Sequence, residues 1–326
     1  MSTISSCIPE SRRPRYFDAG PFLLAGTGQL EPGFAVAFTQ EVLQDVINYS
    51  PKDDDLFIVT YPKCGTTWMQ QIVCCMKNGF PPKNAHELFS LSPFLEMMGT
   101  GVLKPTDGSS TEYTSIKIHL PYELTPKNSK AKYIVVLRNP KDTVVSFFHH
   151  TKGINLYGFQ HGLFDDYFEL FMEGNVDFGE YYDWITSWLP HRKDPNVFWI
   201  TYERMKSHTK EVLKELADFI GVADKMKSNP NFIQDVMHGS SLTHMRQTIN
   251  TSMALFLKDS NDNLEKNDAS PEESPKKGFE FVRKGVVNDW KNTLSTEQNE
   301  RISQKFRLKA QEYPELLTVW EDYSWL

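Results

Sequence analysis

The stretch LFIVTYPKCGTTW, residues 56–68, decides the fold of this chain. Residues 56–59 form an apolar run typical of a buried strand, and residues 69–76 are typical of a helix. Lys63 and Gly65 lie in the turn between them. In such a strand–turn–helix arrangement, the unpaired N–H groups of the helix start face an anion. The stretch therefore predicts a loop that holds a phosphate or sulfate group.

This loop differs from the P-loop of nucleoside triphosphatases. That motif requires G-x-x-x-x-G-K-[ST], with the lysine after the second glycine. Here Lys63 precedes Gly65. Taken alone, the segment fits an ordinary strand-to-helix turn with a solvated lysine as well as it fits an anion site. The other segments of the chain are needed to separate the two interpretations.

The composition excludes several classes of protein. No apolar run approaches the length of a membrane span, and residues 1–15 lack the apolar core of a signal peptide, so we expect a cytoplasmic protein. The formal net charge is −7, which disfavours general binding to nucleic acid or to an anionic membrane. An anionic ligand must therefore meet a local cluster of positive groups.

The four cysteines are expected to be reduced thiols. Cys74 and Cys75 are adjacent on a predicted helix and so face different directions, and no C-x-x-C occurs. Cys64 lies beside Lys63 at a predicted helix start, which can lower the pKa of a thiol. An unreactive small residue is favoured over a nucleophile, because a nucleophilic thiol also needs a partner base.

Three further segments are predicted to be strands. Residues 115–120 alternate between apolar and polar, which places Lys117 and His119 on the same side. Residues 132–137 are typical of a central parallel strand, and residues 197–202 are similar. Strands that alternate with helices predict a doubly wound α/β fold with a mainly parallel central sheet flanked by helices.

A second strand-to-helix junction follows the predicted strand at residues 132–137. Asn139 suits a helix N-cap, Pro140 the first helical position and Asp142 the first turn. Ligands of α/β sheets bind at the carboxyl ends of the strands. Arg138 and Lys63 both follow a predicted strand, so we expect them to share one site.

One domain is predicted over residues 1–326. Residues 1–30 are expected to form an extended N-terminal arm, and residues 38–47 an amphipathic helix. Residues 257–280 are polar and charged, which predicts a mobile loop, either a lid or a passive insertion. Residues 295–298 fit a capping box at the start of a final helix.

Four segments, in order along the chain, resemble motifs of the cytosolic sulfotransferases. Residues 61–68 resemble that family's 5'-phosphosulfate loop, Y-P-K-[SC]-G-T-T-W. Residues 117–121 match its K-x-H-L-P segment, and residues 138–146 are similar to its 3'-phosphate strand and helix. Residues 283–291 resemble its R-K-G-x-x-G-D-W-K signature. The resemblance implies the α/β fold already inferred, with a P-loop-like phosphosulfate loop.

The resemblance implies an enzyme that moves the sulfuryl group of 3'-phosphoadenosine 5'-phosphosulfate (PAPS) to a hydroxyl or amine and releases 3'-phosphoadenosine 5'-phosphate (PAP). PAPS carries roughly four negative charges, so several cations and helix N-termini must offset its desolvation. The residues assigned to the nucleotide by resemblance are Lys63, Cys64, Gly65, Thr66, Thr67, Trp68, Arg138, Ser146, Tyr202, Ser240, Leu242, Met245, Arg283, Lys284 and Gly285.

The same resemblance implies three catalytic residues. His119 is expected to be the general base, which gives on the order of 10²–10⁴-fold in rate. Lys63 and Lys117 are expected to stabilise charge in the transition state. A sulfuryl group carries one negative charge fewer than a phosphoryl group, and the sequence has no acidic metal motif, so we expect no metal.

The acceptor pocket is less well defined by the sequence. Phe94, Phe148 and His150 are candidate wall residues, as are Phe147 and Phe159, although aromatic residues in such positions also form ordinary core. Aromatic walls would suit a small acceptor such as a phenol, a catechol, an amine or a steroid-like alcohol.

Several positions depart from the family's patterns. Cys64 replaces the more usual serine, so we expect the backbone to provide that contact. Leu242 stands where an aromatic residue is common, which leaves adenine stacking to Trp68, and Asn288 replaces a glycine. Residues 291–300 match the family's dimer segment only loosely, so a homodimer is left open. A nucleotide kinase and a catalytically silent nucleotide-binding protein are the alternative functions.

Overall fold

The computed structural model of the protein describes residues 7–18, 23–25, 28–31, 34–36, 38–103, 113–253 and 280–320. Between residues 16 and 36 it describes the strands of the backbone alone. The predicted polar loop at residues 257–280 lies outside the described residues, apart from its last residue. No helix in the described ranges is long and apolar enough to cross a membrane.

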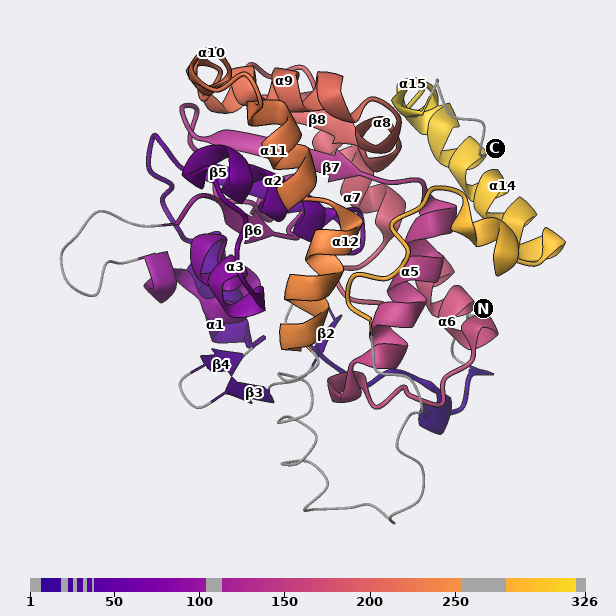
Figure 1. Ribbon diagram of the computed structural model, residues 1–326. Helices are drawn as coiled ribbons and strands as arrows, with labels where there is room; N and C mark the ends of the chain where they lie inside the picture. Colours follow the sequence, from indigo (N-terminus) through magenta and orange to yellow (C-terminus); the bar gives the residue numbers. More distant parts are fainter. Residues whose placement is uncertain are drawn as a thin grey trace.

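A four-stranded parallel sheet forms the centre of the fold (Figure 1). Its strands are β5 (Leu56–Thr60), β6 (Ile116–Ile118), β7 (Lys132–Leu137) and β8 (Val197–Thr201), in the spatial order β6-β5-β7-β8. The chain leaves β5 toward one edge of the sheet and leaves β7 toward the other. The sheet is therefore doubly wound, with its switch point between β5 and β7, where such folds bind ligands.

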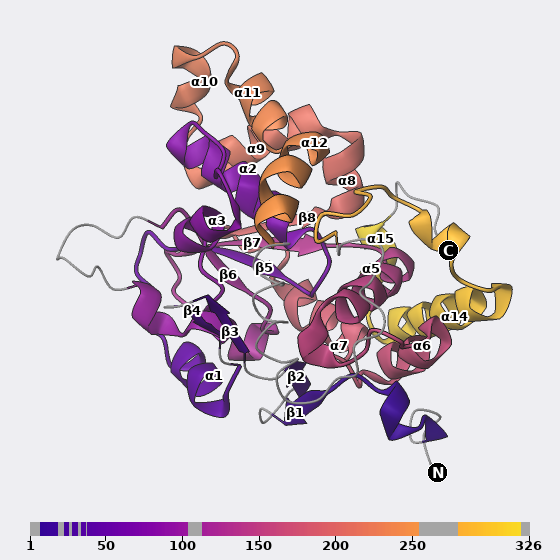
Figure 2. The same cartoon turned by 60° about the horizontal axis from the view of Figure 1, so that its bottom comes forward.

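One layer of helices covers the first face of the sheet (Figure 2). Ile58 and Ile134 point into this layer, because alternate residues of a strand face opposite sides. They belong to one hydrophobic cluster with α2 (Thr66–Asn78), α9 (Thr209–Ile220) and α11 (Phe232–Gly239). The packing fixes the N-terminus of α2 at the carboxyl end of β5.

The second layer covers the opposite face. Phe57 and Val135 pack there with apolar residues of α5 (Pro140–Gly153), α7 (Tyr181–Trp188) and α14 (Thr296–Glu312). Both faces of the sheet are thus buried, which explains why its strands read as nearly continuous apolar runs.

Shorter or peripheral elements complete the described structure. The further helices are α1 (Gln40–Ile47), α3 (Ala85–Leu91), α4 (Leu95–Met98), α6 (Phe164–Glu173), α8 (Tyr202–Ser207), α10 (Asp224–Ser228), α12 (Leu242–Met245) and α15 (Leu316–Val319). Two antiparallel hairpins lie in the N-terminal part: β1 (Tyr16–Asp18) with β2 (Leu23–Ala25), and β3 (Gly28–Glu31) with β4 (Phe34–Val36). The predicted extended arm at residues 1–30 missed these hairpins.

Several local predictions are confirmed. Strand β7 has the predicted bounds, residues 132–137. The Asn139 side chain accepts a hydrogen bond of 2.8 Å from the Asp142 N–H, which caps α5. Ser295 and Gln298 form a reciprocal capping box at the start of α14. These signals are local in sequence, so their prediction did not depend on distant contacts.

Two element bounds differ from prediction by three residues, whereas β8 ends one residue and α1 begins two residues inside the predicted range. Strand β6 spans only Ile116–Ile118 instead of 115–120, because the His119 N–H donates to the Glu96 carboxylate rather than to a neighbouring strand. Helix α2 begins at Thr66, three residues earlier than predicted, since Gly65 is its N-cap and ends the turn.

Candidate active site

One large cavity, with a volume of about 480 Å³, is lined by residues at the carboxyl ends of three strands of the sheet. Lys63 follows β5, His119 follows β6 and Arg138 follows β7. The charged residues among its described lining are Lys63, Lys117, Arg138, Lys206, Arg283, Lys284 and Asp177. Six cations against one carboxylate, in a chain of net charge −7, make this cavity a site for an anionic ligand.

The turn after β5 requires a glycine. Gly65 has φ 105°, and a Cβ built there would lie 2.8 Å from Cδ2 of Tyr202. Lys63 is also left-handed, with φ 68°. Because the N-cap residue Gly65 has no side chain to cap α2, the first N–H groups of the helix are left for a ligand. Thr66 and Thr67 line the cavity at this helix start.

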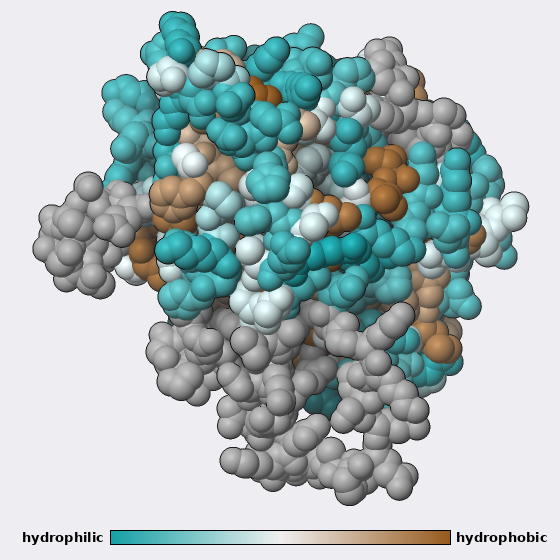
Figure 3. All heavy atoms as spheres, viewed as in Figure 1, coloured by the Kyte–Doolittle hydropathy of each residue, from teal (hydrophilic) through white to brown (hydrophobic). Residues whose placement is uncertain are grey.

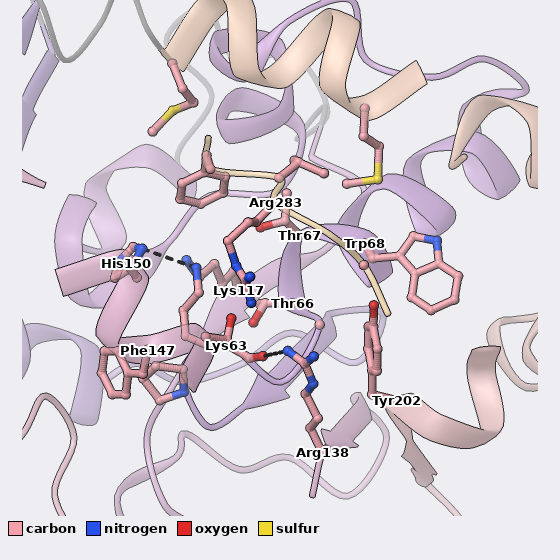
Figure 4. A pocket seen from close by; sticks show the side chains of 18 of the residues that line it. Lys63, Thr66, Thr67, Trp68, Lys117, Arg138, Phe147, His150, Tyr202 and Arg283 are labelled. Carbon is pink, nitrogen blue, oxygen red and sulfur yellow. Dashed lines mark hydrogen bonds between the residues drawn. The ribbon is translucent and has the colours of Figure 1, made fainter. Parts of the chain in front are cut away.

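The Lys63 ammonium lies inside the cavity without an adjacent carboxylate among the described residues. Its Nζ donates a hydrogen bond of 3.2 Å to Nδ1 of His150 and lies 4.8 Å from the ring centre of Phe281 (Figure 4). Burial, followed by the charges of Lys117 and Arg138, lowers the pKa of Lys63 to about 7. An anion bound here would raise that pKa again, because it stabilises the ammonium form.

The Arg138 guanidinium is buried, with 7% of the residue exposed. It donates to the carbonyl oxygens of Lys63 at 3.3 Å and Val286 at 3.1 Å, and it lies 4.6 Å from the ring centre of Tyr202. Its Nε has no hydrogen-bond partner among the described residues. The two hydrogen bonds that this guanidinium donates to Lys63 and Val286 go to neutral carbonyl groups. Its positive charge and its Nε–H group are therefore suited to binding an anionic ligand.

The C-terminal basic segment is held against the start of α5. Both carboxylate oxygens of Asp142 accept backbone hydrogen bonds from this segment, at 2.8 Å from the Asn288 N–H and 3.0 Å from the Trp290 N–H. Asn288 has φ 68°, so it keeps the left-handed turn that a glycine would allow. The departure at this position therefore leaves the turn intact.

Asp289 orients the two cations of this segment. It pairs with Arg283 at 2.8 Å and with Lys284 at 2.7 Å. Burial by itself would raise the pKa of Asp289. The hydrogen bonds that Lys284 and Arg283 donate outweigh this effect of burial, and the pKa of Asp289 is lowered to about 2. The carboxylate therefore stays charged and fixes both cations at the cavity.

The other end of the cavity offers aromatic surface. The rings of Trp68 and Tyr202 meet edge to face with their centres 5.5 Å apart, and Lys206 Nζ lies 5.1 Å from the Trp68 ring. Gly285 has φ 63°, and a Cβ built on it would lie 3.0 Å from Leu242, so the chain approaches α12 closely here. Ser240 and Met245 also line this end.

His119 has the tautomer that a general base needs. Its Nδ1 donates to the Thr60 carbonyl at 2.6 Å, which leaves Nε2 as a lone-pair acceptor. The ring is flanked by Phe94 at 4.9 Å and Phe178 at 5.1 Å between ring centres. Burial, followed by the charge of Lys117, lowers the pKa of His119 well below its usual value, so the imidazole is neutral near pH 7.

Lys117 lies beside this histidine in the cavity. Its Nζ is 3.6 Å from the ring centre of Phe94. Burial lowers the pKa of Lys117 to about 8, while the nearby Glu96 carboxyl opposes that change. Lys117 and His119 thus reach the same cavity, as the alternation of their segment predicts.

The structure brings most of the predicted nucleotide residues together. Those that line the cavity are Lys63, Gly65, Thr66, Thr67, Trp68, Arg138, Ser146, Tyr202, Ser240, Leu242, Met245, Arg283, Lys284 and Gly285. Cys64 is outside the lining: its Sγ lies 3.7 Å from Oγ1 of Thr143 in the core. Burial raises the pKa of the Cys64 thiol to about 12, which agrees with an unreactive residue.

The predicted acceptor walls are brought together only in part. Phe94 and His150 line the cavity, but Phe148 does not. The Phe148 ring packs in the core against Phe159, Phe164 and Tyr167. Of the other candidates, Phe159 does not line the cavity, but Phe147, one residue before Phe148 on α5, does, because consecutive helical residues point about 100° apart.

Sequence reasoning missed several lining residues. Lys206 follows Tyr202 by one helical turn on α8, so the helical period could have indicated it. Asp177 and Phe178 come from the connection between α6 and α7, and Phe281 from the segment before the basic cluster. No local pattern distinguishes these three from ordinary loop residues.

Residues 53–314 match the sulfotransferase domain family. The chain belongs to the sulfotransferase family. A 3-beta-hydroxysteroid sulfotransferase of Cavia porcellus is 32% identical over 293 residues, which cover 88% of this chain and 94% of the relative. Sulfotransferase 2A2 of Mus musculus is 31% identical over 294 residues, 88% of this chain and 95% of that protein. The predicted family and the predicted enzyme class, a transferase of sulfuryl groups, are confirmed.

Solved structures share the fold of this sulfotransferase. Mouse sulfotransferase SULT7A1 complexed with PAP has a TM-score of 0.65 and 24% identity, over 86% of this chain and 92% of the other. Retinol dehydratase in complex with androsterone and PAP has a TM-score of 0.65 and 19% identity, over 90% of this chain and 91% of that one. At these identities the likeness establishes the α/β fold alone.

Proposed function

We propose that this sulfotransferase moves the sulfuryl group of PAPS to a hydroxyl group of a small, largely apolar acceptor. One observation carries the proposal: Lys63, Arg138 and His119 extend from the carboxyl ends of three neighbouring parallel strands into one basic cavity. The cations suit the nucleotide, and the neutral imidazole suits the acceptor hydroxyl.

The cavity residues fit the nucleotide in three places. The turn at Lys63 and Gly65, with the start of α2, would hold the 5'-phosphosulfate, since Gly65 provides no side chain to cap the first N–H groups of that helix. Arg138 would bind the 3'-phosphate through the Nε that the protein leaves without a partner. Ser146, Arg283, Lys284 and Gly285 would complete the 3'-phosphate site, and Trp68, Tyr202, Ser240, Leu242 and Met245 the adenine site.

His119 would act as the general base. Its Nε2 takes the proton of the acceptor hydroxyl while the acceptor oxygen forms a bond to sulfur. The bond between sulfur and the bridging oxygen breaks at the same time, and its electrons leave with PAP. A correctly placed base contributes on the order of 10²–10⁴-fold in rate.

Lys63 would stabilise the oxygen that leaves. Negative charge grows on the bridging oxygen as the bond breaks, and the ammonium lies at the cradle for the phosphosulfate. A well-placed donor in a site without bulk water contributes about 3–4 kcal/mol to transition-state stability. Lys117, which lies in the same cavity as His119, would add to the positive field.

An apolar acceptor is supported by the lining and by the relatives. The described surface on the face in Figure 3 is mainly hydrophilic with a few apolar patches, whereas aromatic residues line the cavity. Phe38, Phe89, Phe94, Phe147, Phe178 and Phe281 line it. A relative named for a 3-beta-hydroxysteroid supports an alcohol as the nucleophile. A cytoplasmic location, a single domain over residues 1–326 and an enzyme without a metal stay predictions, and a homodimer stays open.

A panel of acceptors tests the proposal. The protein is incubated with PAPS and a phenol, a catechol, an aryl amine or a hydroxysteroid, and both PAP and the sulfated product are quantified. We expect PAP release matched by sulfation of a phenol or a hydroxysteroid. Lys63→Met should abolish both, whereas Lys130→Met, which changes an exposed lysine paired with Asp53, should not. PAP binding without transfer to any acceptor would support a catalytically silent protein instead.

A further inference from the structure

A buried carboxylate lies behind the catalytic residues. No part of Glu96 is exposed, and the residue is absent from the described lining of the cavity. One of its oxygens accepts a hydrogen bond from the His119 N–H, while the other has no hydrogen-bond partner among the described residues. Burying a carboxylate whose hydrogen bonds are incomplete costs free energy. We therefore expect the charge of Glu96 to act on the catalytic residues rather than to stabilise the fold.

The segment that carries Glu96 is tied to the strand that carries the catalytic residues. Glu96 lies in the first turn of α4, and β6 is an edge strand of the sheet. The Lys117 N–H donates to the Pro93 carbonyl at 2.8 Å, and Phe94 forms a parallel bridge with Lys117. Two residues later, the His119 N–H donates to the Glu96 carboxylate. The end of β6 is thus held by a backbone carbonyl and an ionisable side chain.

His119 is held at three of its atoms. Its N–H donates to Glu96, its carbonyl oxygen accepts from Nε1 of Trp184 at 2.8 Å, and its Nδ1 donates to the Thr60 carbonyl at 2.6 Å. The Trp184 indole and the Thr60 carbonyl do not titrate, so Glu96 is the ionisable member of this set. The charge of Glu96 therefore acts directly on the backbone of the base.

Glu96 and Lys117 also affect each other. Burial raises the pKa of Glu96 to about 7, and this rise is opposed by backbone hydrogen bonds, first that of His119, and by the charge of Lys117. Burial lowers the pKa of Lys117 to about 8, and the Glu96 carboxylate opposes that fall. Without the carboxylate, the Lys117 ammonium would lose its proton at a lower pH.

The other titratable groups near Lys117 cannot replace Glu96 in this role. Those that interact with Lys117 electrostatically are either neutral or positive: Lys63, His119 and His150. Asp177 lines the same cavity, but among the carboxylates of the described residues the pKa of Lys117 responds to Glu96 alone. Glu96 is therefore the carboxylate that favours the charged form of Lys117.

We infer that Glu96 is a positioning residue of the sulfuryl-transfer site: its carboxylate holds the backbone of His119 and keeps Lys117 charged beside that base. The inference rests on the proposed function and adds to it a residue outside the cavity lining. A positive charge at the transferring group stabilises the transition state more strongly in a site without bulk water. Loss of the Glu96 charge should therefore lower turnover most where Lys117 is close to losing its proton.

Glu96→Gln isolates the charge of this residue. The amide has nearly the same size and keeps an oxygen that can accept the His119 N–H, so the fold is preserved. The measurement is kcat from pH 6 to 10 with saturating PAPS and the best acceptor. We expect the alkaline decline of kcat to move to lower pH by about 1 unit in this variant. At pH 8.5, kcat should therefore fall by about three- to tenfold.

A second substitution tests whether this shift passes through Lys117. Lys117→Arg keeps a positive charge across the whole pH range, so adding Glu96→Gln to it should no longer move the residual profile. A purely structural role of Glu96 would instead lower kcat by the same factor at every pH in both proteins. Glu87→Gln is the matched control: Glu87 accepts the Lys83 N–H at 2.6 Å, but this hydrogen bond is exposed and outside the cavity lining. The control should leave the profile unchanged.

A titration of Lys117 by NMR gives a measurement that needs no turnover. Lysines are labelled with ¹³C at Cε, and the signal that disappears in Lys117→Arg is assigned to Lys117. We expect its midpoint at about pH 8 in the unmodified protein and about 1 pH unit lower in Glu96→Gln. An unchanged midpoint would overturn the inference, whether or not the protein transfers sulfuryl groups.

The remaining outcomes are distinguishable from one another. An alkaline decline of kcat that stays in place in Glu96→Gln would overturn the inference and leave the proposed function standing. A shift that persists in the Lys117→Arg protein would overturn the role of Lys117 in it. Absence of sulfated product with every acceptor would overturn the proposed function, and the Lys117 titration would still decide whether Glu96 supports the charge of Lys117.

Discussion

Gly65→Ala is expected to weaken nucleotide binding far more than an ordinary glycine substitution would. The added Cβ would lie 2.8 Å from Cδ2 of Tyr202, closer than real Cβ contacts allow. The Tyr202 ring cannot easily move away, because it lies over the Arg138 guanidinium at 4.6 Å and meets the Trp68 ring at 5.5 Å. The turn itself must therefore shift, and with it the N–H groups at the start of α2.

The size of the effect follows from two contributions. An alanine held at φ 105° costs about 1–2 kcal/mol. Forcing a methyl group against a packed ring costs about 1–3 kcal/mol more. A total of about 2–5 kcal/mol, if the turn regains its binding geometry only when the nucleotide is present, lowers PAP affinity by about 30- to 5,000-fold.

Calorimetric titration with PAP measures this loss, and thermal unfolding measures any loss of stability. Gly79→Ala is the matched control: Gly79 is also left-handed, with φ 85°, but no atom of the described residues lies within 4 Å of its added Cβ, and it ends α2 away from the cavity. The control should lose about 1 kcal/mol of stability and keep its PAP affinity. A Gly65→Ala protein that binds PAP within about threefold of the unmodified enzyme would refute the reasoning.

Three further predictions concern charge, a thiol and the link between two segments. The pKa of Lys63 is lowered to about 7, so above that pH most of the free enzyme carries a neutral Lys63 amine. This amine must take up a proton when the anionic nucleotide binds, and PAP affinity should therefore fall by up to about tenfold per pH unit from pH 7 to 9. Lys63→Arg should remove this slope in calorimetric titrations, and a flat profile in the unmodified enzyme would contradict the assignment. Burial raises the pKa of the Cys64 thiol to about 12, whereas Cys7 is exposed, so Ellman's reagent at pH 8 should modify Cys7 rapidly and leave Cys64 unmodified. Rapid reaction of Cys64 in the native protein would be inconsistent with its burial. Asp142→Ala leaves two backbone N–H groups without their acceptor and should lower the free energy of unfolding in urea by about 2–4 kcal/mol; a loss below about 0.5 kcal/mol would show that the segment is held by other contacts.

Local signals made much of the fold predictable. A capping residue, a helix-starting proline and an unbroken apolar run each act within a few residues, which is why β7 and the start of α5 lie where the sequence predicts. The sheet then brings Lys63, His119 and Arg138 together, since all three follow strands that end at the same edge. A motif at a strand end therefore indicates both the fold and the site.

The remaining parts of the site depend on long-range contacts. Asp177 reaches the cavity because its turn is tied to Tyr61, 116 residues earlier in the chain, and no pattern around it signals that contact. Phe147 and Phe148 are chemically identical neighbours, and only the rotation of α5 against the sheet decides which one lines the cavity. The bounds of β6 depend on Glu96, a side chain from another element that takes the His119 N–H.

The most direct test of the central claim compares His119→Ala with the unmodified enzyme in two measurements on the same preparation. The first is kcat for sulfation of the best acceptor, and the second is the dissociation constant of PAP. If His119 is the base of a preformed nucleotide site, kcat falls on the order of 10²–10⁴-fold while PAP binding stays within about threefold. A variant that turns over normally would contradict the role of His119, and a variant that loses PAP binding in proportion to its activity would contradict the separation of base and nucleotide site.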